Sequence, residues 1–313
     1  MTEPLALGID IGGTNTAYGI VNRRGEIIVK GSFPTTGHAS AEVYVGELRK
    51  ELLPVIEKAG RENITGAGIG APNGNFFTGE IVFAPNMPWK GVIPIARLIG
   101  DSLGLKAKLT NDANAAAIGE MMYGAAKGMK DFILVTLGTG LGSGFVANGE
   151  LIYGHDGFAG ELGHVIAVRD GRQCGCGRYG CLEAYASATG IVYSAEELLL
   201  EVEDDTVLRE HQGKITAKMI HEAAEQGDAF AIELFDFTAR ILGQTLADTV
   251  AITSPQAIIF FGGLAKAGDL LLSRVHKYLE ANLLNIYQNK IILLQSALPD
   301  ADAAILGASA LAW

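Results

Sequence analysis

The chain has 313 residues, 49% of them hydrophobic and 19% charged, and its formal net charge at pH 7 is −11. This length allows about two domains with sizeable cores and excludes a small scaffold stapled by disulfides. Because the net charge is negative, repulsion disfavours nucleic acid and anionic membrane surfaces as partners. The 41 glycines are clustered rather than periodic, which indicates tight turns that approach ligands closely.

The N-terminal residues do not resemble a secretory leader. Glu3 stands where a leader carries basic residues, and the apolar run breaks at Asp10. No stretch of the sequence reaches the roughly 18 uninterrupted apolar residues of a membrane span, so we expect a cytoplasmic protein without a membrane partner. The three cysteines all lie between Cys174 and Cys181, which favours metal ligation over an oxidised disulfide framework.

One sequence pattern occurs twice. Residues 5–28 read LALGIDIGGTNTAYGIVNRRGEII, and residues 133–152 read ILVTLGTGLGSGFVANGELI. Each copy has an apolar strand, a glycine-rich turn and a second apolar strand, followed by Asn and Gly, which predicts two β-hairpins. The copies lie too far apart for a solenoid repeat. We therefore expect a duplicated domain whose two lobes present their glycine-rich hairpins to one cleft.

Helical and strand patterns alternate along the rest of the chain, which predicts an α/β fold. The expected elements are helix 41–59, strand 65–70, helix 93–103, strand 106–110, a glycine- and cysteine-rich insert at 171–181, helices 183–200, 216–227 and 228–250, strand 257–261, helix 269–284, strand 290–294 and a helix from Asp302. The acidic run 201–205 is expected to be a solvated loop. We expect a smaller lobe of residues 1–117 plus 301–313 and a larger lobe of residues 118–300.

The first hairpin turn, residues 10–16, reads DIGGTNT. Gly12 and Gly13 would let backbone amides approach phosphate oxygens, Thr14 would add a hydroxyl donor, and Asp10 could hold a metal through water. The alternative is an ordinary hairpin turn in which glycine and Asn15 supply positive φ angles.

A matched second turn makes the phosphate-binding interpretation stronger, because residues 138–144 read GTGLGSG. This turn is not a dinucleotide fingerprint, because it leads into a strand and not into a helix. It is not a Walker loop either, because it lacks the Gly-Lys-Ser/Thr sequence. Gly138, Thr139 and Gly140 are the candidate phosphate-binding residues of this turn.

A predicted strand ends at Thr110 and runs into a predicted helix, with Asn111 and Asp112 at the junction. Either residue is expected there simply as a helix N-cap. The functional alternative is compatible with that role. A carboxylate at the end of a strand could accept a hydroxyl proton and orient the oxygen for in-line attack on a γ-phosphate.

Three thiolates and one imidazole form the most distinctive constellation. His164 precedes Cys174, Cys176 and Cys181 at a spacing that suits tetrahedral Zn²⁺, and His155 is the rival histidine ligand. Because these four ligands leave no coordination position open for a substrate or water, the metal ion is predicted to be structural.

Other residues are candidates for binding a sugar or a nucleotide. Glu161, Glu183 and the second ring nitrogen of His164 would form a polar cluster that binds sugar hydroxyls. Asn86 lies between prolines and fits either a turn or a ligand contact. Gly262 and Gly263 follow a strand and would serve as a helix entry or meet an adenine and ribose.

These motifs resemble the ROK family of sugar kinases, within the actin-like ATPase superfamily. The resemblance covers essentially the whole chain and is carried by GLGSGF at 140–145, GELGH at 160–164 and CGCGRYGCLE at 174–183. Glucokinase is the subgroup that the chain resembles most. The resemblance implies two actin-like lobes, phosphoryl transfer from ATP·Mg²⁺ to the 6-hydroxyl of glucose, structural Zn²⁺ and a homodimer.

The resemblance also implies a role for each candidate residue. Asp112 matches the catalytic base; Asn86, Asn111, Asp112, Glu161, His164 and Glu183 match sugar-binding positions; Asp10, Gly12, Gly13, Thr14, Asn15, Gly138, Thr139, Gly140, Gly262 and Gly263 match nucleotide-binding positions; and His164, Cys174, Cys176 and Cys181 match zinc ligands.

One segment departs from the family pattern. Many relatives have Gly-x-Pro-Gly where this chain has Gly70-Ala-Pro-Asn73-Gly74, so Asn73 either fills space near a sugar substituent or occupies a left-handed turn. An N-acetylglucosamine or N-acetylmannosamine kinase is therefore the alternative within the kinase class. A sugar-responsive repressor is the alternative from another class, and it needs an N-terminal DNA-binding module, for which the short stretch before Asp10 leaves no room.

Overall fold

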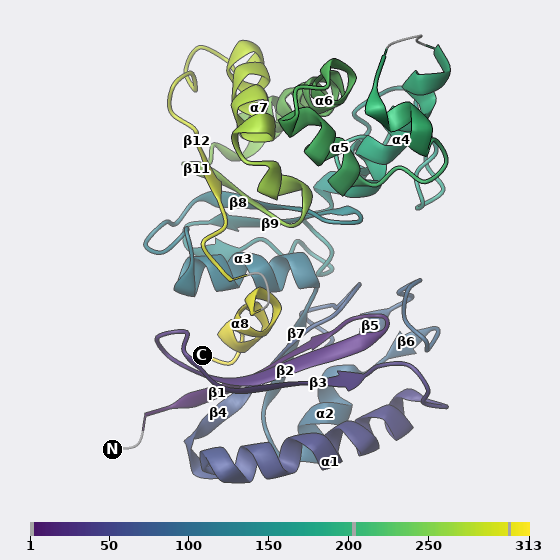
Figure 1. Ribbon diagram of the computed structural model, residues 1–313. Coiled ribbons are helices and arrows are strands. Elements are labelled where there is room, and N and C mark those ends of the chain that lie inside the picture. Colours follow the sequence, from purple (N-terminus) through teal and green to yellow (C-terminus); the bar gives the residue numbers. More distant parts are fainter. Residues whose placement is uncertain (1–2, 202–204, 300–301) are drawn as a thin grey trace. The chain divides into compact units, whose positions relative to one another are not determined.

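The computed structural model describes residues 3–201, 205–299 and 302–313 (Figure 1). Contacts divide the chain into two compact units. The first unit comprises Met1–Lys130, Gly144–Gly160 and Ser296–Trp313, and the second comprises Asp131–Ser143 and Glu161–Gln295. The lobe boundaries expected from sequence, at 117 and 301, stay predictions.

The first unit is built on a five-stranded sheet with the order β3-β2-β1-β4-β7. Its strands are β1 (Leu5–Ile11), β2 (Asn15–Asn22), β3 (Ile27–Pro34), β4 (Ile64–Gly70) and β7 (Ala107–Thr110). Strands β1, β4 and β7 run parallel, and the β1–β2 and β2–β3 pairs are antiparallel. A separate two-stranded sheet pairs β5 (Ile81–Val82) with β6 (Val92–Ile93).

Helices cover both faces of this sheet (Figure 1). They are α1 (Ala41–Ala59), α2 (Ile95–Leu103), α3 (Asp112–Tyr123) and α8 (Ala303–Ala310). Helix α8 packs directly on β1 and β4, and α3 packs on α8. A Cβ added at Gly8 or Gly68 would overlap the backbone of α8, so glycine permits this close approach.

The second sheet has the order β10-β9-β8-β11-β12. Its strands are β8 (Phe132–Leu137), β9 (Leu141–Ala147), β10 (Glu150–Leu151), β11 (Ala257–Phe261) and β12 (Ile292–Gln295), and the division between the units falls within β9. The helices of the second unit are α4 (Ala188–Glu201), α5 (Ala217–Glu225), α6 (Ala229–Thr253) and α7 (Asp269–Asn282). Helices α6 and α7 pack against each other.

The predicted α/β fold and its duplication are confirmed, because the two sheets have corresponding strand orders and each contains the predicted glycine-turn hairpin. The predicted helix 183–200 is wrong at its start. Residues Leu182–Ala184 form a short 3-10 helix, and α4 begins only at Ala188. The Ser187 hydroxyl accepts the Gly190 N–H at 2.9 Å and donates to the Glu183 carbonyl, so it caps the helix at that point.

Two further expectations from the sequence concern the acidic run and membrane spans. Residues 202–204 of the acidic run lie outside the described residues, and Glu201 is the last residue of α4. Within the described parts of the chain, the helices are all too short or too polar to cross a membrane.

Candidate active site

The carboxyl ends of three parallel strands bring polar motifs of the first unit to one sheet edge. Asp10 of β1 pairs with Gly70 of β4, and Gly70 pairs with Thr110 of β7. Asp112 follows Thr110 by two residues, so it lies at the same edge as Asp10. In open α/β sheets, ligands bind at this edge.

The carboxylates of Asp10 and Asp112 lie close enough to influence each other. Burial, and after it the negative charge of Asp112, raise the pKa of Asp10 from 3.8 to about 7. Asp112 itself is exposed. Two carboxylates that resist joint ionisation form a site that a divalent cation would stabilise.

The first predicted phosphate turn is compact and tightly packed. The Gly12 N–H donates to the Asn15 carbonyl at 3.0 Å, and the Thr35 N–H donates to the Thr14 carbonyl at 2.8 Å. A Cβ at Gly13 would overlap the backbone carbonyl of Asn86. The structure therefore places predicted residue Asn86 directly against the turn, and Gly13 must be glycine for that contact.

Asn111 and Asp112 occupy the start of α3. Asn111 is the N-cap, and its Oδ1 accepts the Asn114 N–H at 2.7 Å. Asp112 is the first helical residue, where the partial positive charge of the helix N-terminus favours a carboxylate. The capping role that the sequence left open is thus confirmed for Asn111, and it leaves the Asp112 carboxylate exposed for chemistry.

Asn73 adopts a left-handed conformation, with φ of 51°. Its Nδ2 donates to the Val82 carbonyl at 3.0 Å. The side chain therefore stabilises its own loop, which is the turn alternative of the two that the sequence allowed.

The second unit repeats the arrangement at the ends of β8 and β11. Phe261 pairs with Thr136, so the turn Gly138–Gly140 and the pair Gly262–Gly263 follow neighbouring strand ends. Gly262 has φ of +101°, and a Cβ there would lie 2.7 Å from the Leu137 carbonyl oxygen. Both predicted nucleotide motifs of this unit thus lie at one sheet edge.

Four side chains of the second unit form a group that could hold a metal ion. The ligand atoms of His164, Cys174, Cys176 and Cys181 all lie within 4.8 Å of one another, and His155 is not part of the group. The Cys176 and Cys181 sulfurs are 3.7 Å apart, and Cys174 Sγ is 3.8 Å from His164 Nδ1. Tetrahedral zinc with Zn–S bonds of about 2.3 Å requires ligand separations of about 3.8 Å.

The thiols of this group need a cation to ionise together. Burial raises the pKa of Cys174 to about 12. Burial and the neighbouring Cys176 thiol raise the pKa of Cys181. A bound dication would deprotonate both thiols outright.

The predicted sugar-binding residues of the second unit are brought together beside this group. Glu161 is exposed and precedes the 3-10 helix Leu162–His164, while Glu183 lies in the 3-10 helix Leu182–Ala184. The Leu182 N–H donates to the Val165 carbonyl at 3.0 Å and joins the two segments. Glu183 Oε1 lies 3.6 Å from Cys174 Sγ.

Sequence reasoning missed a buried hydroxyl cluster beneath the first turn. The Thr16 hydroxyl lies 2.8 Å from the Thr35 hydroxyl and 2.7 Å from the Tyr44 hydroxyl, and all three residues are buried. Asp10 contributes to raising the pKa of Tyr44, after burial. The sequence signal was Thr16, a polar residue at a position where the strand is otherwise buried.

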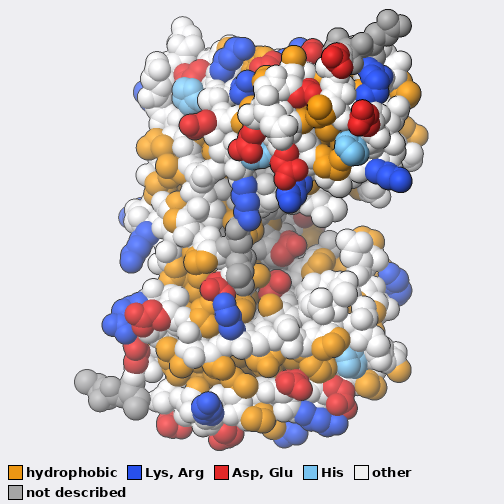
Figure 2. Space-filling model, in the orientation of Figure 1, with side chains coloured by type: hydrophobic (Ala, Val, Ile, Leu, Met, Phe, Trp, Pro, Cys, Tyr) orange, Lys and Arg blue, Asp and Glu red, His pale blue; other side chains and the backbone are white. Residues whose placement is uncertain are grey.

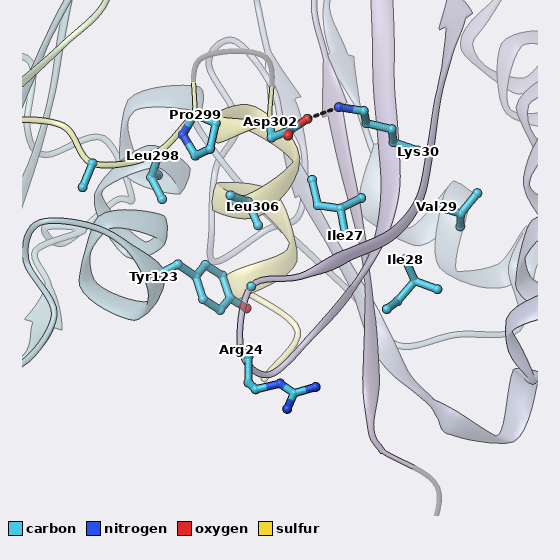
Figure 3. Close-up of a pocket in the computed structure, with 12 residues that line it drawn as sticks. Arg24, Ile27, Ile28, Val29, Lys30, Tyr123, Leu298, Pro299, Asp302 and Leu306 are labelled. Carbon is cyan, nitrogen blue, oxygen red and sulfur yellow. Dashed lines mark hydrogen bonds and ion pairs between the residues drawn. The ribbon is translucent and has the colours of Figure 1, made fainter.

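One cavity of the first unit is separate from all these residues (Figure 3). It has a volume of about 440 Å³ and is lined by Ile27–Lys30, Tyr123, Leu298 and Asp302 among others. The Lys30 Nζ and Asp302 Oδ1 atoms are 2.5 Å apart across its rim. Because β2 leads away from the predicted phosphate turn, from Asn15 to Asn22, this cavity lies at the other end of that strand.

Acidic and basic side chains are interspersed on the face of each unit drawn in Figure 2.

Two sheets of corresponding strand order, each with a glycine-rich turn at its carboxyl edge, define a duplicated α/β protein. A family model described as the ROK family matches residues 6–313. The chain therefore belongs to the ROK family.

Several proteins similar to this chain are named for a specific activity. A glucokinase from Halalkalibacterium halodurans is 36% identical over 288 residues, which cover 90% of this chain and 87% of that enzyme. An N-acetylmannosamine kinase from Escherichia coli O157:H7 is 32% identical, over 98% of this chain and 97% of that enzyme. The solved structure of a ROK family glucokinase from Streptomyces griseus, in complex with glucose and AMPPNP, is 33% identical with a TM-score of 0.78, over 98% of both chains.

Proposed function

We propose that this protein is a glucokinase, which transfers the γ-phosphoryl group of ATP·Mg²⁺ to the 6-hydroxyl of glucose and gives glucose 6-phosphate and ADP. The observation that carries the chemistry is the pair Asp10 and Asp112 at the carboxyl edge of the first sheet, beside a glycine turn. The choice of glucose rests on the similarity to glucokinases.

Asp112 is the proposed general base. Its exposed carboxylate accepts the proton of the 6-hydroxyl as that oxygen attacks the γ-phosphorus in line. The carboxylate lies at the N-terminus of α3, where Asp112 Oδ1 accepts the Ala113 N–H at 2.8 Å. Asn111 uses Oδ1 to cap the helix, so its Nδ2 remains a donor for a sugar hydroxyl.

The glycine turns are the proposed nucleotide-binding elements. The backbone N–H groups of Gly13 and Gly140 would donate to phosphate oxygens, with hydroxyls from Thr14 and Thr139. The N–H groups of Gly12 and Gly138 donate to the Asn15 and Gly140 carbonyls within their own turns, so these two glycines would instead let the backbone approach a phosphate without a side chain in the way. Mg²⁺ bound with ATP would neutralise developing phosphate charge, and Asp10 would hold it through water. Gly262 and Gly263 would accommodate the adenosine, because neither presents a side chain.

We propose that His164, Cys174, Cys176 and Cys181 hold Zn²⁺, since their separations fit tetrahedral ligation. All four positions are filled by protein, so the role of the ion is structural. It would fix His164 by Nδ1 and leave Nε2 for a sugar hydroxyl, with Glu161 and Glu183 beside it.

A second candidate function is phosphorylation of N-acetylmannosamine. The similarity to an N-acetylmannosamine kinase, nearly as high as that to the glucokinase, favours it. A pocket discriminates against a small extra substituent by only about 1–3 kcal/mol, so few residues separate the two specificities.

The deciding experiment measures ADP formation from ATP·Mg²⁺ in parallel with glucose, N-acetylglucosamine, N-acetylmannosamine and fructose. The proposal requires kcat/KM for glucose to exceed the others by about tenfold or more. If an acetamido sugar leads, glucose falls as the substrate while the kinase assignment stands. If no sugar supports turnover, the kinase assignment falls.

Three finer properties are proposed from the family resemblance: Zn²⁺ as the bound metal, a cytoplasmic location and a homodimer. Elemental analysis of the purified protein identifies the metal. Light scattering after size-exclusion chromatography gives the mass in solution, and about twice 32.9 kDa is expected. Cell fractionation reports the location.

A further inference from the structure

The carboxylate of Glu183 makes a contact that sugar binding does not explain. Its Oε2 accepts the backbone N–H of Leu141 at 2.9 Å, across 42 residues of sequence. Leu141 follows Gly140, the last residue of the second phosphate turn. A side chain from the 3-10 helix Leu182–Ala184 therefore fixes the position where that turn enters β9.

Gly140 is shaped to this contact. A Cβ added at Gly140 would overlap Oε2 of Glu183 before any other atom. The neighbouring Gly138 has nothing within 4 Å of its added Cβ. A side chain at 140 would thus displace the Glu183 carboxylate, whereas a side chain at 138 would enter open space beside the turn.

The backbone that carries Glu183 is itself firmly held. The Ser187 hydroxyl donates to the Glu183 carbonyl at 2.8 Å. Arg172 donates to the Ala184 carbonyl at 3.0 Å and to the Ser194 hydroxyl at 2.9 Å. The Arg172 guanidinium also lies 4.5 Å from the centre of the Tyr185 ring. Because its own segment is held from several sides, Glu183 can hold the turn in place.

We propose that Glu183 is a positioning residue for nucleotide binding, in addition to its proposed sugar contact. Its hydrogen bond to Leu141 holds the turn Gly138–Gly140 in the geometry that receives phosphate. Nucleotide affinity therefore depends on Glu183 even when no sugar is present. This inference rests on the proposed kinase function, because it assigns that turn to phosphate binding.

The test is nucleotide binding in the absence of sugar, measured calorimetrically with AMPPNP·Mg²⁺. Glu183→Ala removes the acceptor and should weaken binding about tenfold, the usual worth of a hydrogen bond to a charged group. Glu183→Gln keeps an acceptor oxygen and should retain most of the affinity. Glu150→Ala removes an exposed carboxylate on β10 and is the matched control, with nucleotide affinity expected within about twofold of the parent protein.

A second perturbation reaches the same bond from the other side. Gly140→Ala should push the Glu183 carboxylate away from Leu141 and weaken nucleotide binding. If both variants act through one hydrogen bond, the double variant Gly140→Ala/Glu183→Ala loses no more than the worse single variant. Additive losses mean that the new methyl group blocks phosphate directly, and they overturn the coupling between these two residues.

The outcomes separate this inference from the proposed function. If the parent protein phosphorylates glucose and Glu183→Ala binds AMPPNP·Mg²⁺ as the parent does, the positioning role is wrong and the kinase assignment stands. If the parent protein neither binds AMPPNP·Mg²⁺ nor phosphorylates a sugar, the kinase assignment is wrong. Metal content and melting temperature are measured for each variant, and a loss of affinity that tracks a loss of metal or of folding also overturns the positioning role.

Discussion

Replacing Asp10 with Asn should make the ligand-free protein more stable, and increasingly so as pH rises. Burial raises the pKa of Asp10 from 3.8 to about 7, so between these pH values the folded protein binds a proton that the unfolded chain has released. Stability from this group is therefore fully present below about pH 4 and is lost as pH rises through 7. Asn has the shape of the neutral acid and does not ionise, so it escapes the penalty.

The magnitude follows from the size of the shift. About three pKa units correspond to at most about 4 kcal/mol of destabilisation at pH 8, and about 1.5 kcal/mol of this is already present at pH 5. The stability difference between Asp10→Asn and the parent protein should thus grow by about 2.5 kcal/mol between pH 5 and pH 8.

Urea denaturation of both proteins across this pH range measures the difference. Asp101→Asn is the matched control, because Asp101 is an exposed aspartate on α2, and its difference from the parent should stay flat. If the stability difference for Asp10→Asn also stays constant with pH, then the interpretation of Asp10 as a buried carboxyl group with a raised pKa is wrong. The same variant should bind Mg²⁺-nucleotide less tightly, because the charge that stabilises the cation is gone.

Three further predictions concern stability and the metal. Gly68→Ala places a Cβ onto the Ala308 carbonyl and should lower the free energy of unfolding, measured with urea, by about 3 kcal/mol or more. Its control is Gly46→Ala in α1, where nothing lies within 4 Å of the added Cβ, and this variant should raise the free energy of unfolding by up to about 1 kcal/mol. Equal effects of the two variants would contradict the packing of α8 on the sheet. Cys176→Ser should lower the metal content to well below one ion per chain by elemental analysis, and retention of a full equivalent would exclude the four-ligand site. Chelation of the metal from the parent protein should lower the melting temperature and the affinity for sugar, and an unchanged melting temperature would refute a structural metal.

Much of the fold was predictable because it follows from local patterns. The apolar period of residues 41–59 and the apolar run 257–261 predict the helix and the strand at the observed bounds. The repeated hairpin predicts the duplication that the two strand orders confirm. These features depend on periodicity and turn chemistry, which are written in neighbouring residues.

The remaining features depend on tertiary contacts between distant residues. The high pKa of Asp10 arises from burial and from Asp112, about a hundred positions further along the chain. The bond between Glu183 and Leu141 joins a loop to a hairpin. The start of α4 at Ala188 depends on the Ser187 hydroxyl competing for a backbone N–H, which helix propensity alone does not reveal.

The central claim is that Asp112 acts as the base in phosphoryl transfer to a sugar. The most direct measurement compares kcat for glucose with ATP·Mg²⁺ in the parent protein and in Asp112→Asn. We predict a loss of about 10²–10⁴-fold in kcat, with the metal content unchanged and no loss in melting temperature, because Asp112 is exposed and Asn can occupy the same helical position. Turnover by Asp112→Asn within a few-fold of the parent protein would contradict the account.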